Sequence, residues 1–276
     1  LGAVGLGHVD LFDRKFKPLL VKSDAVMAPS CYRCPYNRAK PARKNSTQSR
    51  ECQWECVSLV EKKLKSERYA AFVVEPLIQG AAGMWTHPPG YLAKVARIAK
   101  KTGTLLILDE VMTGFGRTGT MFACEKEKVS PDFLCLAKGL TGGTLPLAAT
   151  LTTKKVFDAF LGKYEEMKTF FHGHSYTGNP LGCAAALANL EIFEREKTLA
   201  RIKQLEKVLS KSLEKFWKLD HVGDIRQAGL VAGIELVQDW KTQKPFPWKR
   251  RMGIQVCDLA KKKGVLTRTI GNIIVL

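Results

Sequence analysis

Four short apolar runs recur along the middle of the chain and constrain its fold more than any other feature. They lie at residues 70–75, 105–110, 133–138 and 147–151, and a helical pattern at residues 88–101 separates the first two. Short, continuous apolar strands that alternate with helices typically form a mainly parallel sheet whose faces are covered by helices. The sequence therefore predicts an α/β fold.

A second unit is expected after this sheet. An amphipathic helix is predicted from Leu199 to Phe216, and beyond residue 221 a strand at residues 230–236 and a helix at residues 254–263 suggest a smaller α+β domain. We therefore divide the chain into a large domain, residues 1–195, and a linking helix with a small domain, residues 196–276. The chain starts in mid-pattern and stops on the apolar run 273–276, which we expect to be a strand with unfinished pairing. Both domains are thus expected to be incomplete pieces of a longer protein.

The net charge of +18 raises the question of nucleic-acid binding. Basic residues concentrate at 33–50, with six and no acid, and at 241–268, with nine against Asp258 alone. Neither stretch interleaves aromatic residues for base stacking. We expect no nucleic-acid partner, although a non-catalytic basic binding protein stays the alternative from a different class. No apolar run reaches the roughly 18 residues of a membrane helix, so no membrane span is expected.

Eight cysteines without a secretory signal favour reduced thiols and a cytoplasmic protein. Four of them, Cys31, Cys34, Cys52 and Cys56, have a spacing close to that of a structural zinc site. The second pair is one residue wider than usual. Loop thiols are therefore favoured, and a zinc site or a redox pair remains open.

The chemistry is expected where the strands end. Three apolar runs end in an ionisable residue, Glu75, Asp109 and Lys138, and ligands of open α/β sheets bind at the carboxyl ends of the strands. A lysine after such a strand is expected to be partly desolvated, which makes its amine nucleophilic. Together with a buried Asp109, it fits pyridoxal phosphate: the lysine holds the cofactor, and the aspartate keeps its ring nitrogen protonated.

A glycine motif, Gly114 to Gly119, matches G-x-G-x-x-G. Five residues separate it from the preceding strand, and no convincing helix opens after Gly119. A dinucleotide site is therefore not expected.

At this point the sequence resembles a known family. The blocks 74–80, 109–119 and 136–143 are similar to those of class III aminotransferases in order and spacing. Three further blocks, 119–125, 141–147 and 172–181, resemble the branch that aminates 8-amino-7-oxononanoate in biotin biosynthesis. The resemblance covers essentially the whole chain. It implies a fold type I pyridoxal-phosphate-dependent transferase.

The resemblance also implies roles for individual residues. Lys138 would hold the cofactor and move the proton, Asp109 would pair with the pyridinium nitrogen, and Val111 would pack on the ring. Ser175 would reach the phosphate of the other subunit's cofactor, which makes a homodimer the expected active unit. Substrate binding would fall to Gly173 and Arg268, whose guanidinium suits a carboxylate.

The implied reaction converts 8-amino-7-oxononanoate to 7,8-diaminononanoate, with S-adenosylmethionine or lysine as the amino donor. Another class III ω-aminotransferase is the alternative, although such enzymes often have Gln where this chain has Met112. An inactive fragment is a further alternative. Because the family's upstream phosphate-binding segment precedes residue 1, we expect the chain alone to bind the cofactor weakly.

Overall fold

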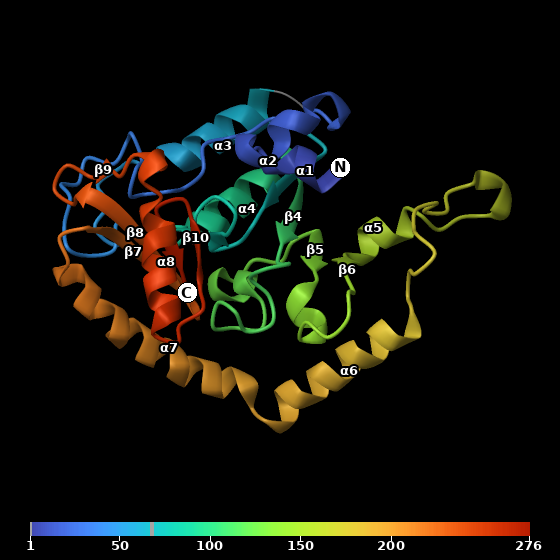
Figure 1. The fold of residues 1–276 in the computed structure, drawn as a ribbon. Helices are drawn as coiled ribbons and strands as arrows, with labels where there is room; N and C mark the ends of the chain where they lie inside the picture. The colour runs from blue at the N-terminus through green and yellow to red at the C-terminus, as the bar shows by residue number, and fades with distance from the viewer. Residues whose placement is uncertain (1, 67–68) are drawn as a thin grey trace.

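The computed structural model describes residues 2–66 and 69–276, and a four-stranded sheet forms the centre of the larger part. Its strands are β1 (Ala71–Val74), β4 (Leu105–Asp109), β5 (Phe133–Leu136) and β6 (Ala149–Thr152), in the order β1-β4-β5-β6. The first three are parallel, and β6 is antiparallel to β5. The predicted mainly parallel sheet is therefore confirmed (Figure 1).

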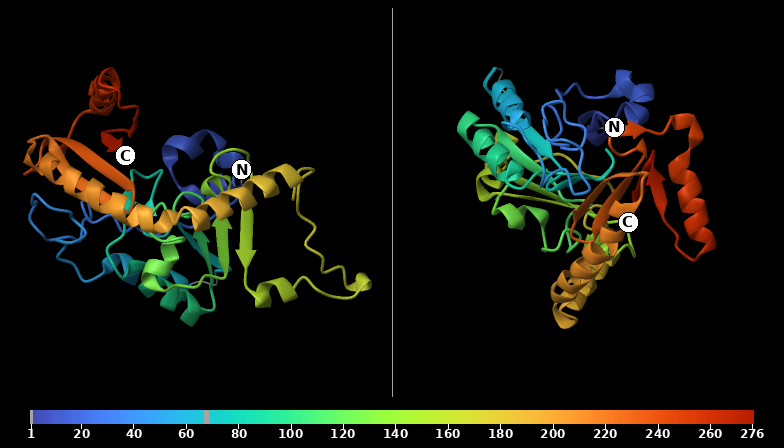
Figure 2. Two further views of the ribbon diagram at one scale, coloured as in Figure 1. Left: turned by 90° about the horizontal axis from the view of Figure 1, so that it is seen from below. Right: turned by 90° about the vertical axis from the view of Figure 1, so that its left-hand side faces the viewer.

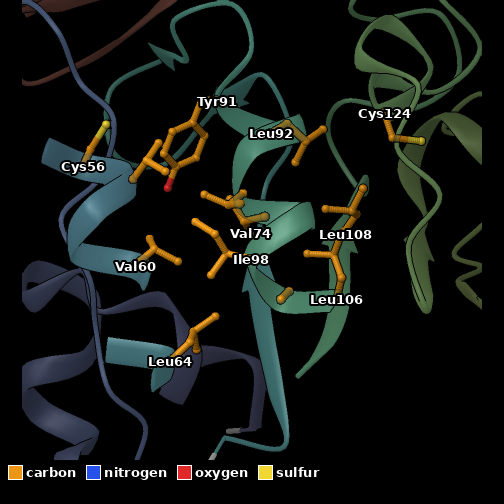
Figure 3. Close-up of a cluster of buried hydrophobic side chains, with 13 residues drawn as sticks. Cys56, Val60, Leu64, Val74, Tyr91, Leu92, Ile98, Leu106, Leu108 and Cys124 are labelled. Carbon is orange, nitrogen blue, oxygen red and sulfur yellow. The ribbon is translucent and has the colours of Figure 1, made fainter. Parts of the chain in front are cut away.

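One face of this sheet is buried under α3 (Glu55–Ser66) and α4 (Tyr91–Thr102). Leu106 and Leu108 of β4 point into this core, where Val60, Leu92 and the other side chains of the cluster pack (Figure 3). On the opposite face the alternate side chains of β4 are only half-buried. Since side chains of a strand alternate between faces, Asp109 lies on this more open face.

Two helices run along one edge of the molecule (Figures 1 and 2). Helix α6 (Pro180–Arg195) begins with a side-chain cap, because Asn179 accepts a hydrogen bond from the backbone N–H of Gly182. Helix α7 (Thr198–Glu214) follows almost directly, as the apolar stripe predicted. Before them, α5 (Lys154–Asp158), the 3-10 helix η4 (Tyr164–Glu166) and the loop up to residue 179 form an arm that projects from the body (Figure 1).

The C-terminal unit is an antiparallel sheet with one helix, as expected. Its strands are β7 (Val222–Ala228), β8 (Val231–Asp239), β9 (Lys244–Pro245), β10 (Arg268–Ile270) and β11 (Ile273–Val275), and its helix is α8 (Met252–Lys262). The expectation of unfinished pairing for the last run is wrong. Strand β11 pairs with β10 on one side and β8 on the other, so its backbone bonds lie within the sheet.

The N-terminal part begins with α1 (Gly2–Gly7), α2 (Asp10–Asp13) and the 3-10 helix η1 (Arg14–Leu19). Residues 20–54 then form neither helix nor strand, and Val26 and Met27 of this segment pack against the main core. Arg33 forms an ion pair with Glu235 at 2.6 Å, and Arg43 donates to the carbonyl of Leu219 at 2.6 Å. The segment thus contacts both parts of the chain, and the division at residue 196 stays a prediction.

A short hairpin, β2 (Ile78–Gln79) with β3 (Trp85–Thr86), connects β1 to α4. Its turn contacts the C-terminal unit, since the buried Arg226 donates to the carbonyl of Gly83 at 3.1 Å. Within residues 2–66 and 69–276, no helix has the length and apolar character that a membrane crossing requires.

Candidate active site

Glu75, Asp109 and Cys135 form a row toward the carboxyl ends of β1, β4 and β5, and Lys138 follows β5 two residues after its last strand residue. Asp109 is the register partner of Cys135, and Glu75 follows Val74, the partner of Leu108. Glu75 and Cys135 therefore lie on the same face as Asp109. Burial raises the pKa of both groups, and the nearby Asp109 raises them further. Of the three strand-end residues predicted from the sequence, Glu75 and Asp109 lie on this face, and Lys138 lies near enough for its charge to oppose the rise in the pKa of Glu75. Cys135 was not predicted.

Asp109 leaves part of its carboxylate available. Its Oδ1 accepts a hydrogen bond from the backbone N–H of Val111 at 3.0 Å, which fixes the orientation of the group. Among the described residues, no donor lies within hydrogen-bonding distance of Oδ2. The side chain is half-buried, whereas the sequence predicted a buried one, because only one face of the sheet is fully covered. A carboxylate with one fixed and one open oxygen suits an N–H⁺ donor such as a pyridinium.

Lys138 begins the turn after β5. Its backbone has φ +44°, the left-handed region that non-glycine residues seldom adopt, at a cost of roughly 1–2 kcal/mol. Lys138 is also the first residue of the 3-10 helix η3 (Lys138–Thr141). The side chain is exposed, so the expected partial desolvation is wrong for this structure. The sequence pattern correctly placed Lys138 just after a strand. The burial of its side chain depends on which segments cover the half-buried face of the sheet, and a local pattern does not show this.

An asparagine that sequence reasoning missed holds the lysine's turn in place. Asn189 of α6 donates to the carbonyl of Gly139 at 2.8 Å and to that of Leu140 at 3.2 Å. Leu140 also packs in a small apolar cluster with Ala186 of the same helix. Helix α6 was not predicted, and its only strong signal was the Asn179-Pro180 start.

A second missed residue, Glu110, organises the loop that follows Asp109. Its carboxylate is fully buried and accepts from the backbone N–H groups of Ala123 at 2.7 Å and Cys124 at 2.9 Å, and from the hydroxyl of Thr113 at 3.0 Å. These bonds close the loop that contains the glycine motif. No helix opens at Gly119, so that expectation is confirmed.

The other predicted site residues lie apart from this row. Gly173 and Ser175 are exposed in the arm, and Arg268 is exposed at the start of β10. Within the described ranges, none of them makes a hydrogen bond or ion pair to Asp109 or Lys138. Their roles stay predictions.

The four clustered cysteines do come together. Cys31, Cys34, Cys52 and Cys56 line one small cavity, and all are free thiols. Apart from residues 1, 67 and 68, no group of three or more His, Cys, Asp or Glu side chains is placed to hold a metal ion.

Comparison with known proteins assigns the family. The model of aminotransferase class-III matches residues 14–276, so the chain belongs to the class-III aminotransferases. More particularly, it is 48% identical to the adenosylmethionine-8-amino-7-oxononanoate aminotransferase of Geobacter sulfurreducens, over 100% of this chain and 60% of that protein. The chain therefore spans about 60% of the length of this relative.

Solved structures agree with this assignment. The adenosylmethionine-8-amino-7-oxononanoate aminotransferase of Methanocaldococcus jannaschii superposes with a TM-score of 0.85 at 43% identity, over 100% of this chain and 59% of that one. An omega transaminase from Pseudomonas jessenii, solved in complex with PMP, gives a TM-score of 0.87 at 28% identity, over 100% and 59% of the two chains. Both support the predicted fold type I architecture.

Proposed function

We propose that this protein is a pyridoxal-phosphate-dependent aminotransferase whose cofactor is held by Lys138, Asp109 and Val111. The observation that carries the proposal is the row at the strand ends, in which Asp109 keeps one oxygen open beside the turn that begins with Lys138. When bound, the cofactor supplies an electron sink that labilises the bond to the amine-bearing carbon.

The residues of this chain divide the remaining work. Asp109 would keep the ring nitrogen of the cofactor protonated through its carboxylate. Lys138 presents its amine at the end of β5 and takes and returns the proton that the substrate loses. Val111 packs on the ring, and the bond from its backbone N–H keeps the Asp109 carboxylate aligned.

We further propose that the acceptor is 8-amino-7-oxononanoate and the product 7,8-diaminononanoate. Support comes from the Geobacter and Methanocaldococcus relatives, whose sequences are 48% and 43% identical to this chain, whereas the omega transaminase is 28% identical. Arg268 would bind the acceptor's carboxylate, with Gly173 beside it, and the donor would be S-adenosylmethionine or lysine. Another ω-aminotransferase is the second candidate, favoured by the high structural similarity to the Pseudomonas enzyme.

The proposed active unit is a homodimer in which Ser175 contacts the partner's cofactor phosphate. The arm that carries Ser175 exposes many large apolar side chains, and such a concentration on a surface often marks an interaction site. They are Phe157, Phe160, Leu161, Tyr164, Phe170, Phe171 and Tyr176. A second copy of the chain is the occupant that these residues fit.

Product analysis tests this proposal. The chain would be incubated with millimolar pyridoxal phosphate, 8-amino-7-oxononanoate and either donor, and the diamine measured by mass spectrometry, with Lys138→Ala as the blank. Diamine formation with one donor is expected. Transfer only to unrelated ketones would favour the second candidate, and no transfer to any ketone would contradict the proposal.

A further inference from the structure

The cysteine cluster lies in a part of the chain that regular secondary structure does not hold together. Residues 20–54 contain no helix or strand, and Cys31, Cys34 and Cys52 belong to this segment. Cys56 lies in the first turn of α3, at the border of the main core (Figure 3). A loop of this length inside a compact unit is uncommon and is often functional.

The four thiols differ in access. Cys31 and Cys56 are buried, with 7% and 8% of their surface exposed. Cys34 and Cys52 are half-buried, and each also lines a second, open hollow on the surface. A small oxidant would therefore meet Cys34 or Cys52 before the two buried thiols.

Cys52 differs from Cys34 because a cation is fixed on its sulfur. The Nη1 of Arg50 lies 2.9 Å from Cys52 Sγ, and the Arg50 guanidinium is stacked over the Trp54 ring at 3.8 Å. The stacking holds the guanidinium in place. A fixed N–H donor supports the negative charge that sulfur carries when it attacks an electrophile.

The buried thiols suit a different role. Burial, with smaller contributions from the neighbouring cysteines, raises the pKa of Cys31 to about 12 and that of Cys56 to about 11, although the charge of Arg50 acts in the opposite direction on both. These groups keep their protons at neutral pH, so they are poor first nucleophiles. Both line the same small cavity as Cys52, so they are the thiols that an oxidised Cys52 would meet first.

We propose that Cys52 is a peroxide-oxidation site that forms an intramolecular disulfide with one of the other three thiols of this cavity. The Cys52 thiolate attacks hydrogen peroxide, which gives a sulfenic acid and hydroxide. The second thiol then displaces the sulfenic oxygen, which takes up the thiol proton and leaves as water. One peroxide is thereby reduced and two thiols are oxidised. The irregular backbone of residues 31–52 can adjust to the bond.

The disulfide would act on the contacts of this segment. The segment contacts the C-terminal unit through Arg33, which pairs with Glu235, and through Arg43, which donates to the carbonyl of Leu219. The hydroxyl of Ser46 donates to the buried carboxylate of Asp224. A bond from Cys52 to the 31–34 turn or to α3 would restrict the whole segment. This inference does not depend on the proposed aminotransferase activity.

Thiol mapping tests the proposal. The reduced chain would be treated with limiting hydrogen peroxide, the remaining thiols alkylated, and the peptides mapped without reduction. Cys52 is expected in a disulfide with Cys31, Cys34 or Cys56 before Cys135 and Cys183 lose their thiols. The last two are half-buried as well, but within the described part of the chain no arginine or lysine donates to their sulfur.

Variants separate the role of Arg50 from general charge. Arg50→Gln is expected to slow the oxidation roughly threefold or more, because the donor to sulfur is lost. Arg38→Gln is the matched control, since Arg38 lines the same open hollow without contacting Cys52, and it should leave the rate unchanged. Urea unfolding of each reduced variant shows whether it is folded, and Arg50→Lys, which keeps a cation, should retain more of the rate than Arg50→Gln.

Three results would overturn the proposal. They are equal oxidation of Cys52, Cys135 and Cys183, equal rates for the Arg50→Gln and Arg38→Gln variants, and one metal ion per chain retained by the four thiols.

Discussion

Asn189→Ala tests whether helix α6 holds the turn of Lys138. The substitution removes the two hydrogen bonds to the carbonyls of Gly139 and Leu140. At about 1 kcal/mol each they sum to about 2 kcal/mol. Because alanine is the better helix former, it offsets roughly 0.5 kcal/mol of this loss in the free energy of unfolding. The free energy of unfolding should therefore fall by about 1.5 kcal/mol, measured by urea denaturation.

The same variant should lose cofactor binding beyond its loss of stability. Phosphopyridoxyl labelling of Lys138 at subsaturating cofactor should fall by up to about tenfold, because 1.4 kcal/mol corresponds to a factor of ten. Asn45→Ala is the control: Asn45 donates to the carbonyl of Ile225 and accepts from Thr47, far along the chain from the site. It should cost similar stability and leave labelling intact. Equal labelling of the two variants would refute the anchoring role of Asn189.

Two further predictions concern the C-terminal unit. Burial raises the pKa of Asp224 to about 6, above the unfolded value of 3.8, so the group lowers stability as pH rises from about 4 to 6 and the loss persists above. Relative to Asp224→Asn, the wild-type chain should lose about 2 kcal/mol between pH 4 and pH 7, since the unfolded carboxyl is already partly ionised at pH 4; parallel urea titrations of the two would contradict this. Gly229→Ala places a Cβ 2.3 Å from the backbone of Thr118 and should destabilise the chain by at least about 2 kcal/mol more than Gly103→Ala, which shares a positive φ but meets nothing within 4 Å. Equal midpoints in urea would show that the Gly229 contact is not tight.

The strands and the main helices could be predicted because their apolar residues repeat at the spacing of the element. Helix α6 could not, because its apolar residues are not confined to one side: Leu190 and Phe193 pack against a buried cluster, whereas Leu181, Leu187 and Ile192 are exposed. Asn189 was missed for a different reason. Its hydrogen-bond partners are backbone carbonyls of a distant turn, and the pattern of side chains in the sequence does not reveal such contacts.

The candidate site residues could be predicted because they follow apolar strands, but the degree to which each is buried could not. Asp109 and Lys138 lie where the sequence placed them, yet one is half-buried and the other exposed. Burial is set by segments distant in sequence, so a local pattern does not determine it. The cysteine spacing favoured loop thiols and left a zinc site or a redox pair open; their shared cavity, their access and the position of Arg50 required the structure.

The charge pattern shows a similar limit. Within the basic stretch 33–50, three arginines contact groups of the protein itself: Arg33 pairs with Glu235, Arg43 donates to the carbonyl of Leu219, and Arg50 donates to Cys52. Net charge alone therefore overstates the basic surface that a nucleic acid would meet.

Cofactor trapping tests the central claim most directly. The chain would be incubated with millimolar pyridoxal phosphate, reduced with borohydride and mapped by peptide mass, with Lys138→Ala and Asp109→Asn in parallel. The account predicts a phosphopyridoxyl group confined to Lys138, absent from Lys138→Ala and weaker in Asp109→Asn. Labelling scattered over the surface lysines, and equal in all three proteins, would contradict it.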